Sequence, residues 1–167
     1  MGKLVIEISI LFLLVACNLS KSDSENDGYP KNVKRIDQDD SLMNKAIAKA
    51  REEFYVFDSA FRKGNSEKSL FAIKVRFPTN IGGEHIWAHS ISLEGETYYG
   101  ILDDDAISTD NVKAGDKIKI AIDSVSDWIY NDNGVMKGGF TIKVLRNKMT
   151  PKERAAFDST NYLKIVD

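Results

Sequence analysis

The chain has 167 residues, of which 43% are hydrophobic and 29% are charged, and this composition is typical of one globular domain rather than a disordered or multidomain protein. Lys and Arg number 23 against 25 Asp and Glu, so the net charge of −2 does not favour a nucleic-acid partner. The single cysteine excludes an internal disulfide and a multi-cysteine zinc site.

The first residues predict an export signal. Lys3 precedes an apolar run over residues 8–16, which is shorter than the roughly twenty residues that span a bilayer. Leu14-Val15-Ala16-Cys17 resembles the signal of bacterial lipoproteins, and this implies removal of residues 1–16 and acylation of Cys17, including palmitate. Asn18 after the cysteine then implies the periplasmic face of the outer membrane. An ordinary cleaved signal and an uncleaved anchor are the alternatives.

Residues 17–39 are rich in Ser, Asn, Asp and Lys, and they predict a flexible tether because too few large apolar side chains are present for packing. The predicted organisation is therefore a signal peptide over residues 1–16, a tether over 17–39 with a lipidated Cys17, and one globular domain over 40–167.

A helix of about twenty residues is predicted next, because apolar residues recur at steps of three and four. Asp40 or Ser41 can cap its start and Gly64 can end it. Its apolar stripe consists of Met43, Ile47, Ala50, Phe54, Phe57 and Phe61.

After Gly64 the pattern changes to the alternation of β-strands. Asp132-Asn133-Gly134 predicts a tight hairpin, and Thr150 with Pro151 and Glu153 predicts a capped terminal helix through about residue 158. The fold class is thus α+β, with a long N-terminal helix packed on a twisted antiparallel sheet of five or six strands and a short C-terminal helix. The sheet can curl into a partial barrel. Strands are predicted at residues 71–77, 84–93, 97–101, 117–122 and 140–145, and a further strand is predicted to begin at Trp128.

The segment Glu84-His85-Ile86-Trp87-Ala88-His89 carries the first candidate site. In a strand, His85 and His89 lie about 13 Å apart, too far to share one ion, so no metal site is predicted. Alternation places His85, Trp87, His89, Ile91 and Leu93 on one face, where His85 can equally be a hydrogen-bonded core or rim residue.

The segment Asp127-Trp128-Ile129-Tyr130 carries the second candidate site. Trp128 and Tyr130 share a strand face, and two rings with polar edges suit a sugar or a peptide, although such pairs are more often core and rim residues. The acidic run Asp103-Asp104-Asp105 lacks the spacing of a calcium loop and is expected to be a solvated loop.

Five short blocks follow one another along the chain: Glu84–Trp87, Tyr99-Gly100, Val112–Asp116, Asp127–Tyr130 and Gly138–Thr141. In this order they resemble the YegJ-like family of bacterial domains of unknown function (family 2314). The resemblance covers about residues 41–146 and implies no established activity, substrate or catalytic residue.

We therefore expect a non-catalytic, lipid-anchored cell-envelope protein without a cofactor, which binds a peptide, glycan or protein partner. One alternative is a hydrolase in which His85 works with Glu84 or Asp127 as an acid–base pair. Another is a small inhibitor or immunity-type protein. The residues expected to contact the partner are Glu84, His85, Trp87, Asp127, Trp128 and Tyr130.

Overall fold

The computed structural model describes residues 40–65, 70–79, 82–106 and 112–166. The predicted signal peptide, Cys17 and the tether lie outside these ranges. All described residues belong to the structural unit that runs from residue 35 to residue 167.

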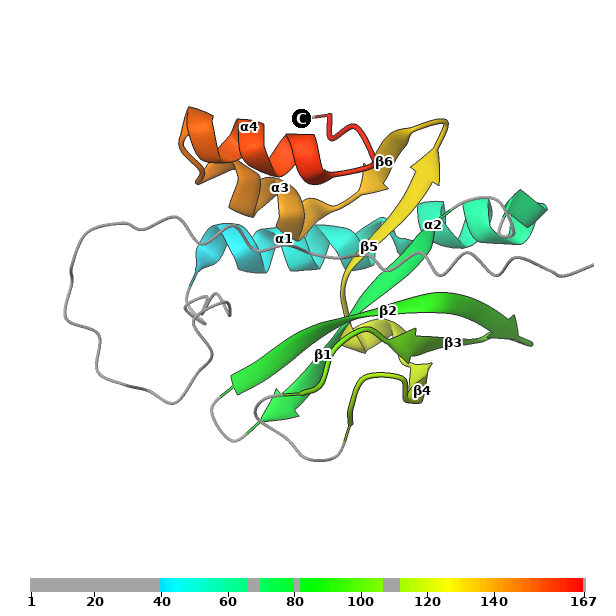
Figure 1. Ribbon diagram of the computed structural model, residues 1–167. Coiled ribbons are helices and arrows are strands. Elements are labelled where there is room, and N and C mark those ends of the chain that lie inside the picture. Colours follow the sequence, from blue (N-terminus) through cyan, green and yellow to red (C-terminus); the bar gives the residue numbers. More distant parts are fainter. Residues whose placement is uncertain (1–39, 66–69, 80–81, 107–111, 167) are drawn as a thin grey trace, which may run out of the picture. The chain divides into compact units, whose positions relative to one another are not determined.

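Six strands form one antiparallel sheet in the order β4-β3-β2-β1-β5-β6 (Figure 1). The α+β prediction is confirmed, and the sheet is open, with β4 and β6 at its edges, rather than closed toward a barrel. The strands are β1 (Phe71–Thr79), β2 (Gly82–Glu94), β3 (Thr97–Leu102), β4 (Lys117–Ile120), β5 (Val125–Asp132) and β6 (Val135–Gly138).

The predicted N-terminal helix is present, but it is interrupted at Glu53, where the backbone leaves helical geometry. Asp40 caps its start by accepting from the backbone N–H groups of Leu42 and Met43. The segments are α1 (Ser41–Glu52), α2 (Phe54–Ala60) and a π-helical turn (Phe61–Asn65).

The apolar stripe of these helices covers one face of the sheet, which we call the helix face. Phe54 and Phe57 are buried there and pack with Phe71, Tyr98 and Trp128. The stripe was therefore correctly predicted as a core face, and the ring contacts hold the centre of the sheet under α2.

The predicted strand over residues 140–145 is wrong, because this segment is the helix α3 (Phe140–Asn147). The hairpin returns earlier, along β6, and the chain then passes through Gly138 and Gly139, whose φ angles are 76° and 66°. Alternation of Phe140, Ile142 and Val144 suggested a strand, but the N-terminus of α3 is held by the side chain of Asp127, a partner that lies on another strand.

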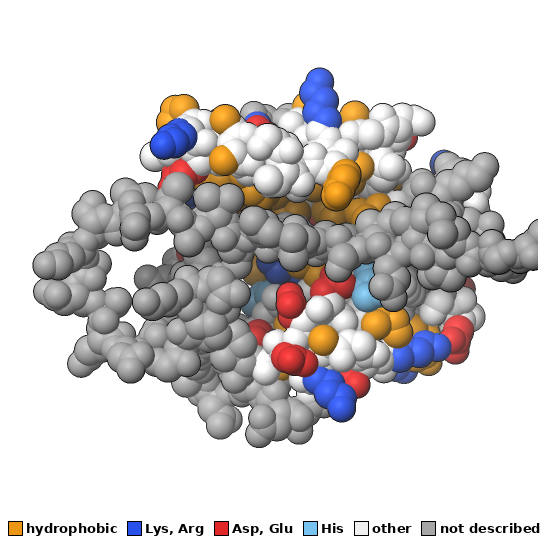
Figure 2. Space-filling view, viewed as in Figure 1, with side chains coloured by type: hydrophobic (Ala, Val, Ile, Leu, Met, Phe, Trp, Pro, Cys, Tyr) orange, Lys and Arg blue, Asp and Glu red, His pale blue; other side chains and the backbone are white. Residues whose placement is uncertain are grey.

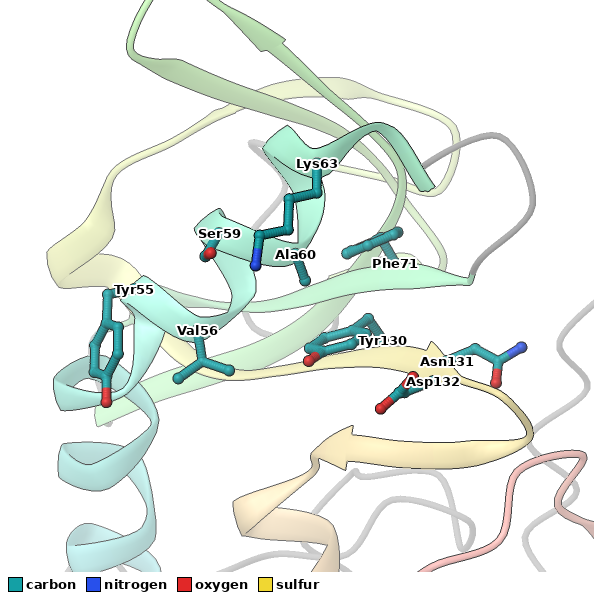
Figure 3. Close-up of a pocket in the computed structure, with 9 residues that line it drawn as sticks. All are labelled: Tyr55, Val56, Ser59, Ala60, Lys63, Phe71, Tyr130, Asn131 and Asp132. Atoms are coloured by element: carbon teal, nitrogen blue, oxygen red, sulfur yellow. The ribbon is translucent and has the colours of Figure 1, made fainter.

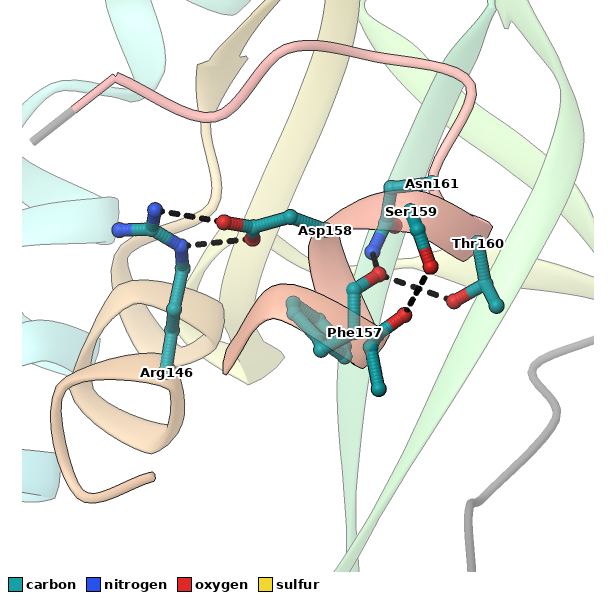
Figure 4. A network of polar contacts seen from close by, with 7 residues as sticks. Arg146, Phe157, Asp158, Ser159, Thr160 and Asn161 are labelled. Carbon is teal, nitrogen blue, oxygen red and sulfur yellow. Dashed lines mark hydrogen bonds and ion pairs between the residues drawn. The ribbon is translucent and has the colours of Figure 1, made fainter. Parts of the chain in front are cut away.

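The C-terminal helix α4 (Pro151–Thr160) confirms the prediction from its capping residues. Thr150 accepts from the backbone of Glu153 and donates its own backbone N–H to the Glu153 carboxylate, which is a complete capping box. Arg146 of α3 donates through Nε and Nη2 to Asp158, with both distances at 2.8 Å, and this ion pair joins α3 to α4 (Figure 4).

A second apolar cluster lies on the opposite face of the sheet. There Ala72, Ile129 and Met136 pack with Ile142 of α3, and Phe157 of α4 and Leu163 lie against them. Trp87 of β2 contacts the border of this cluster. We call this opposite side the Trp87 face.

A β-bulge in β2 changes which side chains share a face. Between His89 and Ser92 the pairing with β3 shifts, and Ser90 has a φ of 48°. Ile86 and Ala88, before the bulge, and Ile91 and Leu93, after it, all belong to the helix-face core. The prediction that Ile91 and Leu93 share a face with the two histidines is therefore wrong, because the extra residue reverses the alternation.

Candidate functional site

The six residues predicted to contact a partner divide between the two faces of the sheet. Strand register places Glu84, Trp128 and Tyr130 on the helix face, where Glu84 lies opposite Phe77. It places His85, Trp87 and Asp127 on the Trp87 face. They do not form one surface.

Trp128 is an interior residue. Its side chain is 1% exposed, and its indole Nε1 donates to the backbone oxygen of Ala50 at 2.7 Å. The ring stacks on Tyr130 and meets Phe140 edge to face. Trp128 therefore joins α1, β5 and α3, and it cannot contact a partner in this conformation.

Asp127 is also buried, with 0% exposure, and its carboxylate holds the N-terminus of α3. One oxygen accepts from the backbone N–H groups of Trp128 and Phe140, and the other accepts from the backbone and the hydroxyl of Thr141. Burial raises the pKa of Asp127, while these hydrogen bonds and the charge of Lys74 oppose the rise. Because all four donors to its carboxylate come from within the domain, we assign Asp127 a structural role.

Tyr130 is half-buried and lines an open pocket of about 370 Å³ between α2 and the strands (Figure 3). Its ring stacks on Phe71 with centroids 5.4 Å apart. Tyr130 is the only one of the six predicted residues in the lining of this pocket. The lining consists of Tyr55, Val56, Ser59, Ala60, Lys63, Phe71, Tyr130, Asn131 and Asp132.

Four side chains form a compact block on the Trp87 face. Lys74 lies opposite Trp87, and Arg76 lies opposite His85, in the pairing of β1 with β2. The Lys74 ammonium lies 5.5 Å from the centre of the Trp87 ring, within the range of a cation–π contact. Trp87 and His85 are both half-buried, so one side of this block faces solvent.

The block is electrostatically positive. Burial, together with the charges of Lys74, Arg76 and Arg51, lowers the pKa of His85 to about 4. The imidazole is therefore neutral at pH 7. Burial also lowers the pKa of Lys74, and the charge of Asp127 opposes this shift.

A second polar pair lies farther along β2. The Nδ1 atom of His89 is hydrogen-bonded to the carboxylate of Asp103, and their side chains are 40% and 29% exposed. Burial raises the pKa of Asp103, whereas the contact with His89 lowers it. Figure 2 shows histidine side chains beside acidic side chains on this side of the molecule, below the upper helical layer.

Sequence reasoning missed Lys74, Arg76 and Asp103 as members of this region. The alternation within β1 already placed Lys74 and Arg76 together, but only the pairing of β1 with β2 brings them to His85 and Trp87. Asp103 was assigned to a solvated loop, and its contact with His89 depends on the β2–β3 pairing.

No helix among the described residues is long and apolar enough to cross a membrane. Within the same ranges, no group of three or more His, Cys, Asp or Glu side chains is arranged to hold a metal ion.

Comparison with known families identifies the domain. The model of the family described as "Uncharacterized protein conserved in bacteria (DUF2314)" matches residues 40–164. The chain belongs to this family. The resemblance expected from the five sequence blocks is thereby confirmed.

Two curated relatives were found among the similar proteins. The uncharacterized protein YegJ of Escherichia coli is 29% identical over 156 residues, which cover 93% of this chain and 94% of that protein. A putative ankyrin repeat protein of Neisseria meningitidis is 30% identical over 132 residues, which cover 74% of this chain. The match spans only about half, 52%, of the Neisseria protein. No solved structure matches the chain significantly.

Proposed function

We propose that this protein is a lipid-anchored binding module of the cell envelope, and that it contacts a peptide, glycan or protein partner through the Trp87 face. The observation that carries this proposal is Trp87, which is half-buried at the border of the second apolar cluster and lies within cation–π range of Lys74.

Trp87 differs from Trp128 and Asp127 in its surroundings. Trp128 and Asp127 have their polar groups satisfied inside the domain, and their roles are explained by folding. Trp87, by contrast, offers an accessible ring beside the neutral imidazole of His85 and a cation. Aromatic residues of this kind are enriched at the centres of binding interfaces.

The membrane anchor is supported by the sequence of the N-terminal segment. Cys17 follows Leu14-Val15-Ala16, and the alignment with YegJ covers 93% of the chain, so it extends into the segment before residue 40. The envelope location, on the periplasmic face of the outer membrane, follows from this proposed acylation and from Asn18.

The relative from Neisseria also favours a binding module. That protein is named for ankyrin repeats, a class of repeat that forms extended binding surfaces. The region similar to this chain occupies about half of it. A domain that occurs in such a protein is well suited to contribute one more binding surface.

The geometry gives little support to a hydrolase built on His85. Glu84 and His85 are neighbours in β2 and therefore point to opposite faces of the sheet. Asp127 lies opposite Lys74, and its two oxygens accept four hydrogen bonds from Trp128, Phe140 and Thr141. Cationic neighbours that keep His85 neutral also weaken it as a general base.

A crosslinking experiment tests the proposed surface. The full-length protein is crosslinked in intact cells and compared with Trp87→Ala, with Tyr162→Ala as the matched control, since Tyr162 is 89% exposed and far more accessible. We expect the crosslinked species to disappear in Trp87→Ala and to persist in Tyr162→Ala. Equal crosslinking in a folded Trp87→Ala protein would contradict the proposal.

A second experiment tests the anchor. Cells are supplied with a clickable fatty-acid analogue, and labelling of the wild-type protein is compared with that of Cys17→Ser. Incorporation by the wild type alone is the expected result. A Cys17→Ser protein that still takes up the label would show that the acyl group is attached elsewhere.

A further inference from the structure

We propose that the open pocket between α2 and the end of β5 binds a saccharide unit, such as the terminal residue of a glycan. The pocket has a volume of about 370 Å³, and Trp87 is not part of its lining. The inference therefore concerns a second site and does not rest on the proposed function of the Trp87 face.

The floor of the pocket is apolar and aromatic. Phe71 of β1 is buried, and the ring of Tyr130 stacks on it with centroids 5.4 Å apart. Val56 and Ala60 line the side that α2 forms. The apolar C–H groups of a sugar ring can pack against such a surface, and the volume lies within the range of small-ligand sites.

The helical side of the pocket carries two polar groups. Val56, Ser59, Ala60 and Lys63 follow one another at steps of three and four, so they share one face of α2 and of the π-helical turn. Figure 3 shows the Lys63 side chain running along the helix toward Ser59. A hydroxyl and an ammonium thereby border the apolar wall.

The strand side of the pocket carries an oriented carboxylate and an amide. The side-chain oxygen of Asn131 accepts from the backbone N–H of Gly134 at 2.8 Å, which leaves its amide nitrogen as a donor. The carboxylate of Asp132 accepts from Nδ2 of Asn133 at 3.1 Å and lies 3.5 Å from Nζ of Lys137. These contacts hold the rim in place before a ligand binds, which lowers the entropic cost of binding.

Three polar groups of the lining are not engaged by other described residues. Within the described ranges, the hydroxyls of Tyr130 and Ser59 and the ammonium of Lys63 form no hydrogen bond or ion pair. Burial and the charge of Asp132 raise the pKa of Tyr130, and the charge of Lys137 opposes this shift. The phenol is therefore protonated at neutral pH and can donate to a ligand.

The mixture of these groups favours a neutral ligand that both donates and accepts. Asp132 accepts only, Lys63 donates only, and the hydroxyl of Tyr130 can do either. Sugar hydroxyls satisfy all three kinds of group at once, whereas a simple anion or cation would leave one charge of the lining beside its own sign. The open side of the pocket leaves room for a longer glycan to continue into solvent.

Nuclear magnetic resonance of labelled tyrosines provides the test. The full-length protein, in micelles of a detergent without a sugar headgroup, is titrated with glucose, galactose and N-acetylglucosamine. Concentrations reach about 50 mM, because dissociation constants on the order of 1 mM are expected for a small ligand in an open pocket. At least one sugar should shift the Tyr130 ring signals in a saturable manner. Tyr162 is 89% exposed and outside the lining, and it serves as the internal reference.

Two further solutes define the ligand class. Sorbitol, an open-chain polyol, offers hydroxyl groups without a sugar ring, and we expect no saturable shift of Tyr130. Glycylglycine carries one ammonium and one carboxylate, so it tests whether the pocket instead takes a zwitterionic peptide end through Lys63 and Asp132.

Variants locate the binding. Asp132→Asn should weaken binding by about tenfold, because a charge-assisted hydrogen bond becomes a neutral one. Ser59→Leu places a larger side chain at an exposed position of the lining and should abolish binding while the domain stays folded. Asp123→Asn removes the same charge from an exposed residue outside the lining and should leave binding unchanged.

Three results would overturn the inference. The first is a Tyr130 response that is unsaturable for all three sugars or equal for sorbitol. The second is saturable binding of glycylglycine alone, and the third is unchanged sugar binding in a folded Asp132→Asn or Ser59→Leu protein. None of these results bears on the Trp87 face, which the crosslinking of Trp87→Ala tests separately.

Discussion

Asp127 holds Thr141, which lies 14 residues later in the chain, by two hydrogen bonds, one from the backbone N–H at 2.8 Å and one from the hydroxyl at 2.6 Å. The same carboxylate also accepts from the backbone N–H of Phe140. A buried acid on β5 thereby caps the first turn of α3, as side chains at helix N-termini do, but from a remote position in the sequence.

This contact predicts that Asp127→Ala strongly destabilises the protein. The change leaves three buried donors and the partly buried N–H of Phe140 without their acceptor, and it removes the negative charge that acts on Lys74. We therefore expect the free energy of unfolding to fall by about 3–5 kcal/mol. Urea unfolding followed by circular dichroism measures the loss. Asp104→Ala, at an exposed position, should remain within about 0.5 kcal/mol of the wild type, and a similar small loss in Asp127→Ala would argue against the cap.

Gly138 is predicted to tolerate no side chain. Its φ is 76°, and a Cβ atom would lie 2.1 Å from the backbone oxygen of Trp128. Gly134 has a similar φ of 84°, but no atom lies within 4 Å of a Cβ placed there. We expect Gly134→Ala to cost about 1–2 kcal/mol through backbone strain alone, and Gly138→Ala to cost at least about 2 kcal/mol more.

Unfolding in urea, or the soluble yield if Gly138→Ala does not accumulate, compares the two glycine variants. Equal stability of both would mean that the chain moves away from the Trp128 oxygen without cost.

The two tryptophans should respond differently to the same substitution. Trp128→Phe removes the hydrogen bond to the Ala50 oxygen and leaves space in the core, so we expect a loss of about 2–3 kcal/mol. Trp87→Phe keeps a ring at a half-exposed position and should cost less than about 1 kcal/mol. Fluorescence adds a second readout. Trp128 is the one tryptophan left in Trp87→Phe, and its emission should resist quenching by acrylamide because the ring is buried. Strong quenching of that signal would place Trp128 nearer to solvent.

Protonation of His85 should destabilise the fold in mild acid. Its pKa is about 4 in the folded protein and about 6.5 when unfolded, so the unfolded chain binds more protons between these values. Stability from this residue is fully present above pH 6.5 and is lost as the pH falls toward 4. Between pH 7.5 and pH 4.5 we expect the free energy of unfolding to fall by about 1–2 kcal/mol because of His85, after allowance for its partial exposure.

The comparison with His85→Gln isolates this effect, since all other titratable groups are the same in both proteins. Urea unfolding at the two pH values should show a smaller acid loss in the variant. Parallel pH dependence of the two proteins would mean that His85 keeps an ordinary pKa in the folded state.

The features that the sequence predicted correctly are those set by neighbouring residues. The stripe from Met43 to Phe61 required only helical periodicity, although it did not indicate the interruption at Glu53. The turn at Asn133-Gly134 has φ angles of 52° and 84°, which these residue types tolerate. The capping box of Thr150 and Glu153 joins residues three apart.

The candidate site could be predicted only in part, for a related reason. Alternation correctly placed Trp128 with Tyr130, and His85 with Trp87, because it operates within one strand. It could not show which residues of Glu84–Trp87 share a face with which residues of Asp127–Tyr130, or that Lys74 and Arg76 lie beside His85 and Trp87. Those relations depend on pairing between strands that are distant in the sequence.

The amino-acid sequence by itself determined the α+β class, the family, the apolar face of the first helices and the local caps and turns. Only the tertiary structure decided that residues 140–147 are a helix, that the bulge at Ser90 reverses the faces of β2, and that Trp128 is interior while Trp87 is accessible. The physical reason is that periodicity fixes which side chains of an element point the same way, whereas the partner that covers or caps them comes from elsewhere in the chain.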